Sequence, residues 1–477
     1  MKLSKLTPLP RGFEDREITS IAWDTRKLAP GALFFAMPGF KTDGGLFIQE
    51  AFDKGAAAVV CAESVTDERC IRVADPRVAL AEASAVWFDH PADRMIMLGV
   101  TGTNGKTTTT YLLKEILERT QKAKVGLIGT NQNIIGGQSF EAQRTTPESY
   151  ELQELFAQMR DAGCTHVVME VSSHALALHR VQGIRFACGV FTNLTEDHLD
   201  FHHTMEEYRD AKALLFRQCD RGVVNLDDEA GRFYVERGVC PMFTYSENKA
   251  SADLTAKNLR LLPDRVEFEA LSDHELCRVV LPIPGGFSVY NALAALGCCV
   301  ALGLSLESCA AALKEVHGVK GRVEVVPTPT DYTVLIDYAH TPDALENVLN
   351  TVRGFTTGRV ICVFGCGGDR DRAKRPIMGA IGARLADIPV VTSDNPRTED
   401  PAAIVNEVLA GFRPGDPEPV VEVDRPTAIH KALSIARAGD TVVLAGKGHE
   451  TYQEVNGVKR HMDEREIVAD YFERARQ

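Results

Sequence analysis

The stretch Gly99-Val100-Thr101-Gly102-Thr103-Asn104-Gly105-Lys106-Thr107-Thr108 decides the fold of this chain. Apolar residues at 95–98 precede it, and apolar side chains follow it at helical spacing, at Leu112, Leu113, Ile116 and Leu117. This pattern predicts a buried strand, a glycine-rich turn and an amphipathic helix. Such a turn directs backbone N–H groups and a helix N-terminus at one point, which suits an anion.

Side chains in this turn suit a nucleotide. Lys106 can reach the outer phosphates, and the Thr107 hydroxyl can bind Mg²⁺. Val100 occupies the place of the first glycine of the strict P-loop pattern, so a tight turn rich in glycine and threonine is the alternative interpretation. The strand, the Gly-Lys-Thr triplet and the helix together favour nucleotide binding by Gly102, Thr103, Asn104, Gly105, Lys106, Thr107 and Thr108.

Length and composition describe a soluble globular protein. At 477 residues the chain predicts about three domains, and its hydrophobic fraction of 44% and charged fraction of 25% are ordinary. The net charge of −13 gives no reason to expect nucleic acid as a partner. If the substrate is anionic, the cations that bind it must be local.

No targeting or membrane segment is expected. Residues 1–10 lack the apolar core of a signal peptide, and no apolar run approaches membrane-spanning length. The 12 cysteines form no paired Cys-x-x-Cys framework, so they are expected to be reduced and mostly buried. We therefore predict a cytoplasmic protein, with no membrane partner, and a monomer.

Strand and helix patterns alternate along the chain and predict an α/β fold. Residues 1–90 predict a small α/β domain, 91–322 a central domain with a mostly parallel sheet, and 323–477 a second open sheet. The predicted central strands are 125–128, 166–171, 189–191 and 222–225. Those of the last domain are 334–336, 360–364, 389–392 and 441–444.

Polar residues follow the ends of the central strands, where such sheets bind ligands. Glu170 could hold Mg²⁺ beside the phosphates or could cap the next helix. The loop 192–203 carries three histidines among acids, for which one histidine near a metal is favoured over a zinc site. Thr204 and Glu207 form a capping-box pattern at the start of a helix. From the sequence alone, Lys212 on that helix is an ordinary amphipathic-helix lysine.

Each predicted strand of the last domain also ends in a polar motif, and four motifs in phase favour a binding face. These motifs are Asp337-Tyr338-Ala339-His340, Gly365-Cys366-Gly367-Gly368-Asp369-Arg370, Asp394-Asn395-Pro396-Arg397 and Gly446-Lys447-Gly448-His449-Glu450.

Taken together, these motifs resemble those of the Mur ligases, the ATP-dependent amide-forming enzymes of cell-wall precursor synthesis. The resemblance runs from about residue 20 to 455 in unbroken motif order. It is carried by the P-loop stretch 101–108, Glu170-Val171-Ser172-Ser173-His174, Thr192-Asn193-Leu194-x-x-Asp197-His198, Tyr290-Asn291-Ala292, Gly321-Arg322, Asp337-Tyr338-Ala339-His340 and Asp394-Asn395-Pro396-Arg397. The last motif looks like that of the members that add meso-diaminopimelate to UDP-N-acetylmuramoyl-L-alanyl-D-glutamate.

The resemblance implies a UDP-binding N-terminal domain, a central ATPase and a C-terminal Rossmann-like domain for the incoming amino acid. It assigns the UDP substrate to Thr25, Phe40, Lys41, Thr42, Thr145, Thr146, Ser172 and Arg180. It adds Asn291, Arg322 and Asp337 to the ATP site. It assigns the amino acid to Arg370, Asp394, Asn395, Pro396, Arg397, Gly446 and Glu450.

The resemblance also implies a catalytic set of Lys106, Glu170, His198 and Lys212. Lys212 matches the lysine that CO₂ carbamylates in this family. The resemblance therefore implies a modified, catalytic lysine in place of an ordinary amphipathic-helix lysine. Mg²⁺ is expected on Thr107 and Glu170, and a second ion on His198 and the carbamate. Without the resemblance, a pairing of Arg397 with Glu399 or Asp400 is an equal alternative.

Two kinds of rival remain open at this point. A sister ligase, such as the L-lysine-adding or D-alanyl-D-alanine-adding enzyme or folylpolyglutamate synthetase, would share the ATPase core. A P-loop switch or regulatory ATPase would hydrolyse ATP without either co-substrate. A guanine-specific Asn-Lys-x-Asp motif is absent, because Asn248-Lys249-Ala250-Ser251 fails at its last position.

Overall fold

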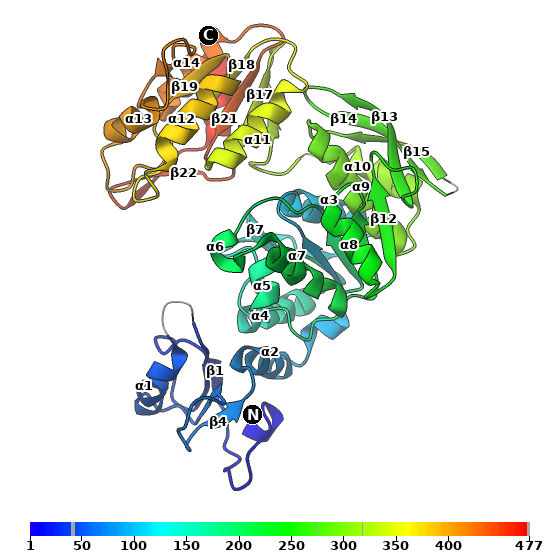
Figure 1. Cartoon of the computed structure of the whole chain (residues 1–477), viewed down its shortest axis with the longest axis vertical. Coiled ribbons are helices and arrows are strands. Elements are labelled where there is room, and N and C mark those ends of the chain that lie inside the picture. The colour runs from blue at the N-terminus through cyan, green and yellow to red at the C-terminus, as the bar shows by residue number, and fades with distance from the viewer. Residues whose placement is uncertain (40–42, 274, 317, 475–477) are drawn as a thin grey trace. The chain divides into compact units, whose positions relative to one another are not determined.

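The computed structural model describes residues 1–477 except 40–42, 274, 317 and 475–477. The chain divides into two compact units, one of residues 1–253 and 294–305 and the other of residues 254–293 and 306–477. Within the described ranges, no helix is long and apolar enough to cross a membrane. Figure 1 traces the elements of both units in chain order.

The first unit begins with a small sheet whose four strands are all parallel, in the order β1-β2-β3-β4. Buried apolar side chains lie on both faces of its strands, as a parallel sheet covered by helices requires. Its elements are η1 (Leu3–Lys5), β1 (Ser20–Ala22), β2 (Ala32–Ala36), η2 (Gly44–Phe47), α1 (Ile48–Asp53), β3 (Ala58–Ala62), β4 (Ile71–Val73) and α2 (Pro76–Trp87).

The larger sheet of this unit has the order β12-β11-β10-β5-β9-β6-β7-β8. The strands from β12 to β6 are parallel, and β6, β7 and β8 are antiparallel to one another. These strands are β5 (Ile96–Thr101), β6 (Val125–Ile128), β7 (Gln132–Ile135), β8 (Gln138–Glu141), β9 (His166–Glu170), β10 (Cys188–Phe191), β11 (Gly222–Asn225) and β12 (Met242–Ser246).

Helices connect these strands, and one of them begins directly after the glycine-rich turn that follows β5. The helices are η3 (Pro91–Arg94), α3 (Lys106–Gln121), α4 (Ser149–Asp161), α5 (Ser173–Ala177), α6 (Leu199–His202), α7 (Met205–Ala213), η4 (Leu214–Gln218) and α8 (Glu229–Arg237). The four apolar residues predicted to face the core from α3 are fully buried. Because β5 lies between β10 and β9, the chain leaves β5 at a topological switch point, where open sheets bind ligands.

The second unit starts with an antiparallel meander that the sequence analysis did not predict. Its strands are β13 (Leu254–Leu261), β14 (Val266–Ser272) and β15 (Glu275–Leu281), and α10 (Leu306–Leu313) packs on β15. The helix α9 (Gly286–Ala301) begins in this unit, and its last residues belong to the first unit.

The other sheet of the second unit has the order β16-β17-β21-β18-β19-β20 and is parallel except for β16. Its strands are β16 (Glu324–Val326), β17 (Thr333–Asp337), β18 (Val360–Phe364), β19 (Ile388–Val391), β20 (Val420–Val421) and β21 (Thr441–Ala445). A hairpin of β22 (Tyr452–Val455) and β23 (Val458–His461) follows.

Both faces of this sheet are covered, so its strands are apolar throughout. Alternate residues of the strands pack against α11 (Pro342–Arg353), α12 (Lys374–Leu385) and α13 (Pro401–Leu409) on one face. The intervening residues pack against α14 (Arg425–Ile435) and α15 (Glu464–Arg474) on the other. Figure 1 shows α11 and α12 side by side over the first of these faces.

The predicted α/β class is therefore confirmed. Three predicted strands, 125–128, 222–225 and 360–364, have the predicted bounds, and the other five differ only at their ends. The division into three domains at 90/91 and 322/323 stays a prediction.

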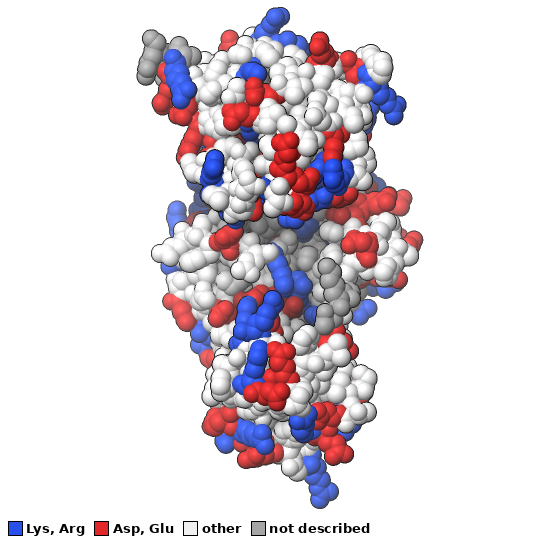
Figure 2. All heavy atoms as spheres, turned by 90° about the vertical axis from the view of Figure 1, so that its left-hand side faces the viewer, with Lys and Arg blue, Asp and Glu red and all other residues white. Residues whose placement is uncertain are grey.

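Charges of both signs lie close together on the part of the surface that Figure 2 draws. Figure 2 shows Lys and Arg interspersed with Asp and Glu over the face that it draws. This face therefore offers no broad field of one sign, so an anion that bound there would need particular cations.

Candidate functional site

The turn between β5 and α3 needs glycine at two positions. Gly102 has a φ of +147°, and a Cβ there would lie 1.9 Å from Thr192 Oγ1. Gly105, at the N-cap of α3, has a φ of +85° in the left-handed region. Residues with a Cβ rarely adopt either conformation. These two glycines therefore allow the backbone to form a tight turn at the N-terminus of the helix.

The loop that follows β10 braces this turn. Thr103 N donates to Asn193 O at 2.8 Å, and Asn104 N donates to Asn193 Oδ1 at 2.9 Å. Thr192 Oγ1 donates to Asn104 O at 2.6 Å. The Thr-Asn pair of the polar loop therefore holds the backbone of the predicted phosphate site in one conformation.

Lys106 lies across the same turn, at the first residue of α3. Its Nζ donates to the carbonyl oxygens of Gly102 and Thr103, each at 2.8 Å. Thr107 follows it and is buried. An ammonium group and a helix N-terminus thus converge at one point, as an anionic ligand requires.

Glu170 ends β9, the strand beside β5, and its side chain is almost fully buried. Thr130 N and Thr130 Oγ1 donate to its two carboxylate oxygens at 2.9 and 3.0 Å. A Cβ at Gly129 would lie 2.4 Å from Glu170 Oε1, so this glycine makes room for the carboxylate. The alternative role of Glu170 as a helix cap is wrong, because Ser172 caps α5.

Three histidines, two of them from the polar loop, form an aromatic cluster beside the turn. The ring of His174 lies 4.8 Å from that of His198 and 5.5 Å from that of His202, between centroids. Burial lowers the pKa of all three, that of His202 to about 4, so each imidazole is neutral at neutral pH. A neutral imidazole is the form that binds a metal ion.

Lys212, on α7, is 1% exposed, so its reading as an ordinary surface lysine is wrong. Its Nζ lies 4.3 Å from the centroid of the Tyr208 ring, and Asp197 is the carboxylate whose charge acts on it. Burial, and then the charge of Lys106, lowers its pKa well below the usual value. Thr204 caps this helix as predicted, because its side chain accepts from Glu207 N.

Four residues predicted for the UDP substrate lie around Glu170. Thr146 Oγ1 donates to Glu170 O at 2.8 Å and accepts from Ser172 N at 3.0 Å. Arg180 Nη1 donates to Thr146 O at 3.1 Å, and Thr145 Oγ1 lies 3.0 Å from Thr130 Oγ1. These side chains and the P-loop therefore line neighbouring strand ends of one sheet.

The remaining residues predicted for the UDP substrate belong to the N-terminal sheet. Thr25 is buried, and its carbonyl accepts from Lys54 Nζ at 2.9 Å. Phe40, Lys41 and Thr42 lie outside the described residues.

The second unit holds the residues predicted to complete the ATP site. Asp337, at the end of β17, accepts from Val323 N at 2.8 Å and from Ala339 N at 2.9 Å. Burial raises its pKa, and the charge of Arg322 opposes this rise. Asn291, on α9, is buried.

The motif after β19 and the motif after β21 form one network. Asn395 Nδ2 donates to Glu450 Oε2 at 3.0 Å, and Lys447 Nζ donates to Asn395 Oδ1 at 2.7 Å. Lys447 is fully buried and also pairs with Glu450 at 2.7 Å. Gly446 has a φ of +118°, and a Cβ there would lie 2.7 Å from Asp394 Oδ2. The structure therefore brings these predicted amino-acid-binding residues together.

Arg397 is held in an unusual backbone conformation, with a φ of +50° directly after Pro396. Its Nη1 donates to Gly368 O at 2.8 Å, and its Nε lies 3.4 Å from Glu454 Oε2. The alternative pairing with Glu399 or Asp400 is wrong, because Arg375 binds Glu399 and Asp400 caps α13. Arg370 is exposed beside it, with Nη1 donating to Asp369 O at 3.1 Å.

Comparison with known proteins decides which family this arrangement represents. Residues 17–98 match the Mur ligase family, catalytic domain. Residues 100–299 match the Mur ligase middle domain, and residues 321–448 match the Mur ligase, glutamate ligase domain. The chain belongs to the Mur ligase family.

Named Mur ligases match nearly the whole chain. A UDP-N-acetylmuramoyl-L-alanyl-D-glutamate–2,6-diaminopimelate ligase of Clostridium botulinum is 46% identical over 463 residues, 95% of each chain. One of Gloeobacter violaceus is 46% identical over 474 residues, 98% of this chain and 96% of its own. A solved structure of a ligase with the same name is 30% identical, with a TM-score of 0.75, and covers 100% of this chain and 99% of its own.

The sequence predicted Arg180 for the UDP substrate of this Mur ligase, but it gave no sign of the two other arginines that cluster with it. Glu148 is buried, and Arg180, Arg77 and Arg144 approach its Oε2 at 3.3, 3.8 and 4.0 Å. Arg77 lies on α2, which packs against the N-terminal sheet, so spacing in the sequence could not reveal its contact with Glu148. Three guanidinium groups on one carboxylate leave an excess of positive charge beside Thr145 and Thr146.

The donor set of this Mur ligase fits Mg²⁺ rather than zinc. Thr107 offers a hydroxyl and Glu170 a carboxylate, which are the hard oxygen ligands that Mg²⁺ prefers. In the described part of the chain, no three His, Cys, Asp or Glu side chains form a group that could hold an ion alone. Mg²⁺ that is held by one or two protein oxygens takes its remaining ligands from water and substrate phosphates.

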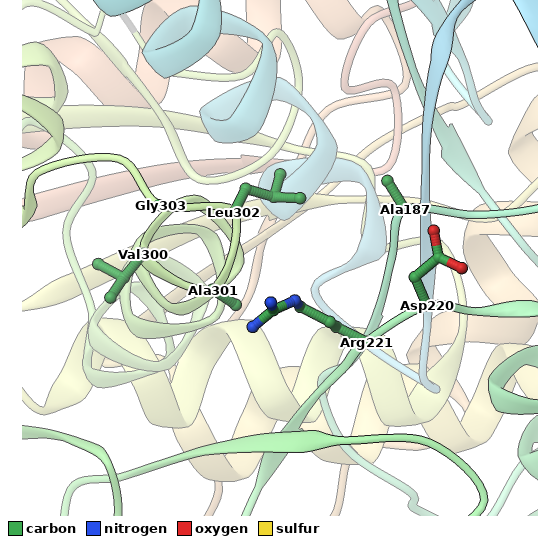
Figure 3. Close-up of a pocket in the computed structure, with 7 residues that line it drawn as sticks. All are labelled: Ala187, Asp220, Arg221, Val300, Ala301, Leu302 and Gly303. Carbon is green, nitrogen blue, oxygen red and sulfur yellow. The ribbon is translucent and has the colours of Figure 1, made fainter.

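A surface pocket of about 390 Å³ in this Mur ligase lies away from these residues. Figure 3 shows Arg221 extending toward Ala301, with Asp220 and Ala187 beside it. Ala187 precedes β10 and Arg221 precedes β11, so the pocket lies at the amino ends of these two strands. The turn after β5 and the loop after β10 lie at the opposite, carboxyl ends of the same sheet. It is therefore distinct from the candidate site.

Proposed function

We propose that this Mur ligase uses ATP to join meso-diaminopimelate to UDP-N-acetylmuramoyl-L-alanyl-D-glutamate, with release of ADP and phosphate, in peptidoglycan precursor synthesis. The observation that carries the proposal is the Asp394–Arg397 motif, which is bonded to Glu450 and Lys447 and presents Arg397. The names of relatives that match nearly the whole chain support the choice of substrates over those of the sister ligases.

The chemistry accounts for the arrangement of the residues. A carboxylate is a poor acyl donor, so its oxygen first takes the γ-phosphoryl group of ATP, and ADP leaves. The amine of the amino acid then attacks the carbonyl carbon of the acyl phosphate, and the amide forms as phosphate leaves. The first step brings anions together, so it needs aligned groups and local positive charge.

We assign the ATP phosphates to the turn from Gly102 to Thr108 and the charge of Lys106. The loop after β10 holds this turn in one conformation through Thr192 and Asn193, and the N-terminus of α3 follows the turn directly. Asn291, Arg322 and Asp337 are proposed to contact the rest of the nucleotide. Mg²⁺, when bound, neutralises phosphate charge and aligns the γ-phosphoryl group.

We assign the metal ligands to residues of the same edge. Thr107 and Glu170 would hold one ion. His198 and a carbamate on Lys212 would hold or orient a second. The buried amine of Lys212 supports this role, because burial favours the neutral amine, which is the form that adds CO₂. The resulting carbamate would supply the oxygens that Mg²⁺ prefers.

The UDP substrate is assigned to Thr25, Phe40, Lys41 and Thr42 at one end and to the side chains around Glu170 at the other. The latter are Thr145, Thr146, Ser172 and Arg180. Arg180 donates to Thr146 and pairs with Glu148, so it supplies a fixed cation for an anionic substrate. With the UDP group held at the N-terminal sheet, the substrate carboxylate would extend toward Glu170 and the turn assigned to the ATP phosphates.

The distal end of meso-diaminopimelate carries a carboxylate and an ammonium group, so its site needs charges of both signs. Arg397 suits the carboxylate because a guanidinium can bind it bidentately. Arg370 could bind another carboxylate, and Glu450 offers an anion for the ammonium group. Asp394, Asn395, Pro396 and Gly446 are assigned to shaping this site.

Arg397→Ala tests this assignment. We expect the KM for meso-diaminopimelate to rise roughly a hundredfold, because removing one partner of a desolvated charge pair typically costs about 2–5 kcal/mol. The KM for ATP should change by less than about threefold. Both constants can be measured from formation of the UDP-muramoyl-tripeptide by mass spectrometry.

Arg384→Ala is the matched control, since Arg384 also pairs with a carboxylate in this unit but lies on the exposed side of α12. It should leave both KM values unchanged. An unchanged KM for meso-diaminopimelate in Arg397→Ala would contradict the role of Arg397. Failure of the unmutated enzyme to form the tripeptide would contradict the proposed function itself.

The cellular setting is also part of the proposal. All 12 cysteines are free thiols, which supports a reducing cytoplasm as the place of the reaction. The monomeric state stays a prediction, which analytical ultracentrifugation would test.

A further inference from the structure

We propose that Tyr208 is a positioning residue that couples the phosphate-binding turn to Lys212. The inference rests on the proposed nucleotide role of that turn, and it deepens that role. Tyr208 lies on α7 one helical turn before Lys212 and is 1% exposed, so its phenol group is enclosed by protein.

The hydroxyl of Tyr208 reaches the turn itself. Tyr208 Oη lies 3.2 Å from Thr103 Oγ1. Thr103 Oγ1 also accepts from Thr195 N at 3.0 Å and lies 3.2 Å from Thr195 O, to which it can donate. Since a hydroxyl has one proton, Thr103 donating to Thr195 leaves Tyr208 as the donor to Thr103. In this set of bonds, the hydroxyl protons of Tyr208 and Thr103 and the amide proton of Thr195 each have an acceptor.

The ring of Tyr208 contacts Lys212, the second group that the inference concerns. Lys212 Nζ lies 4.3 Å from the ring centroid, over its face. One side chain therefore contacts both the turn that would bind phosphate and the amine that would bind metal through a carbamate. A shift of α7 would move Tyr208 and, through Thr103, the turn.

Neighbouring histidines hold the ring in place. The ring of His202 lies 5.0 Å from that of Tyr208 at an angle of 31°, and the ring of His198 lies 6.0 Å away at 86°. His202 Nε2 is in turn 2.9 Å from Ser173 Oγ at the start of α5. Packing on both sides leaves the phenol little freedom to rotate, as positioning requires.

Tyr208→Phe removes the bond to Thr103 and keeps the ring over Lys212. A neutral hydrogen bond of this kind corresponds to roughly a fivefold effect on binding. We therefore expect the affinity for ADP, measured by titration calorimetry on the full-length protein, to fall about fivefold. The kcat should stay within about twofold of the unmutated value, because the ring remains.

Tyr234→Phe is the matched control. Tyr234 is equally buried, and its hydroxyl also binds α7, donating to Arg209 O at 2.8 Å. Both substitutions should lower the melting temperature by similar amounts. Only Tyr208→Phe should weaken ADP binding, so a general loss of stability cannot produce the expected difference.

A double-mutant cycle tests the route through Thr103. After Thr103→Val, the further change Tyr208→Phe should no longer reduce ADP affinity, because their shared bond is already lost. Unchanged ADP affinity in Tyr208→Phe, or a full additional loss in the double variant, would overturn the inference while the ligase assignment stands. Absence of ADP binding in the unmutated protein would contradict the proposed nucleotide site as well.

Discussion

Lys106→Ala is expected to reduce the kcat of ligation by roughly a thousandfold or more, in the range typical for loss of a group that stabilises transition-state charge. Lys106 is the cation at the N-terminus of α3, and its Nζ lies within 2.8 Å of two carbonyl oxygens of the turn. Phosphate release measured at saturating concentrations of all three substrates gives the kcat.

Binding of the UDP substrate should survive this substitution, because its proposed contacts come from other side chains. Titration calorimetry with UDP-N-acetylmuramoyl-L-alanyl-D-glutamate checks this point. Lys114→Ala is the control, since Lys114 lies on the same helix but pairs with Glu118. Near-normal turnover in Lys106→Ala would contradict the assignment of the turn to ATP.

Lys212→Ala is expected to be almost inactive, with kcat lowered by roughly a thousandfold. Acetate or formate should restore part of the activity, because a small carboxylate can enter the space of the missing side chain and supply its oxygens. Sodium chloride at equal ionic strength controls for screening. Lys212→Arg should also be inactive, and carboxylates should not rescue it, because its side chain still fills the site.

The pH dependence of this lysine has a definite sign. Because burial lowers the pKa of Lys212, the neutral amine persists to a lower pH than in a free lysine. CO₂ adds only to the neutral amine, so acidification through the lowered pKa should remove the carbamate. A ¹³C carbamate signal after incubation with labelled bicarbonate should therefore weaken at acid pH and be absent in Lys212→Ala. Full activity of Lys212→Ala without added carboxylate would refute the role.

The sequence sufficed to predict the parts of the fold that depend on local pattern. The strand before Gly102 and the helix after Gly105 follow from apolar periodicity and from glycines at positions of positive φ. The motifs at strand ends were also predicted to converge, because the carboxyl ends of parallel strands share one edge of a sheet.

Contacts between distant segments could not be predicted in this way. Glu454 is the carboxylate beside Arg397, and it comes from the hairpin of β22 and β23, which no earlier motif implied. Asn456-Gly457 between Val455 and Val458 was an available hairpin signal, and both residues have positive φ as a two-residue turn requires.

The sequence pattern also could not predict which polar side chains are buried. Lys212 reads as a surface lysine because its neighbours in the sequence fit an amphipathic helix. Only the fold shows that Lys212 is buried over the ring of Tyr208, against which His198 and His202 also pack. A tyrosine four residues before a lysine on one helix face was a weak signal for this contact, since such residues are neighbours.

Phosphate release from ATP, measured with UDP-N-acetylmuramoyl-L-alanyl-D-glutamate and one of several amino acceptors, tests the central claim most directly. We predict that kcat/KM for meso-diaminopimelate exceeds that for L-lysine by roughly a hundredfold or more, because L-lysine leaves Arg397 without a carboxylate. D-alanyl-D-alanine, or omission of the acceptor, should give only background release. Equal kcat/KM for meso-diaminopimelate and L-lysine would contradict the specificity, and steady release without either co-substrate would contradict the assignment as a ligase.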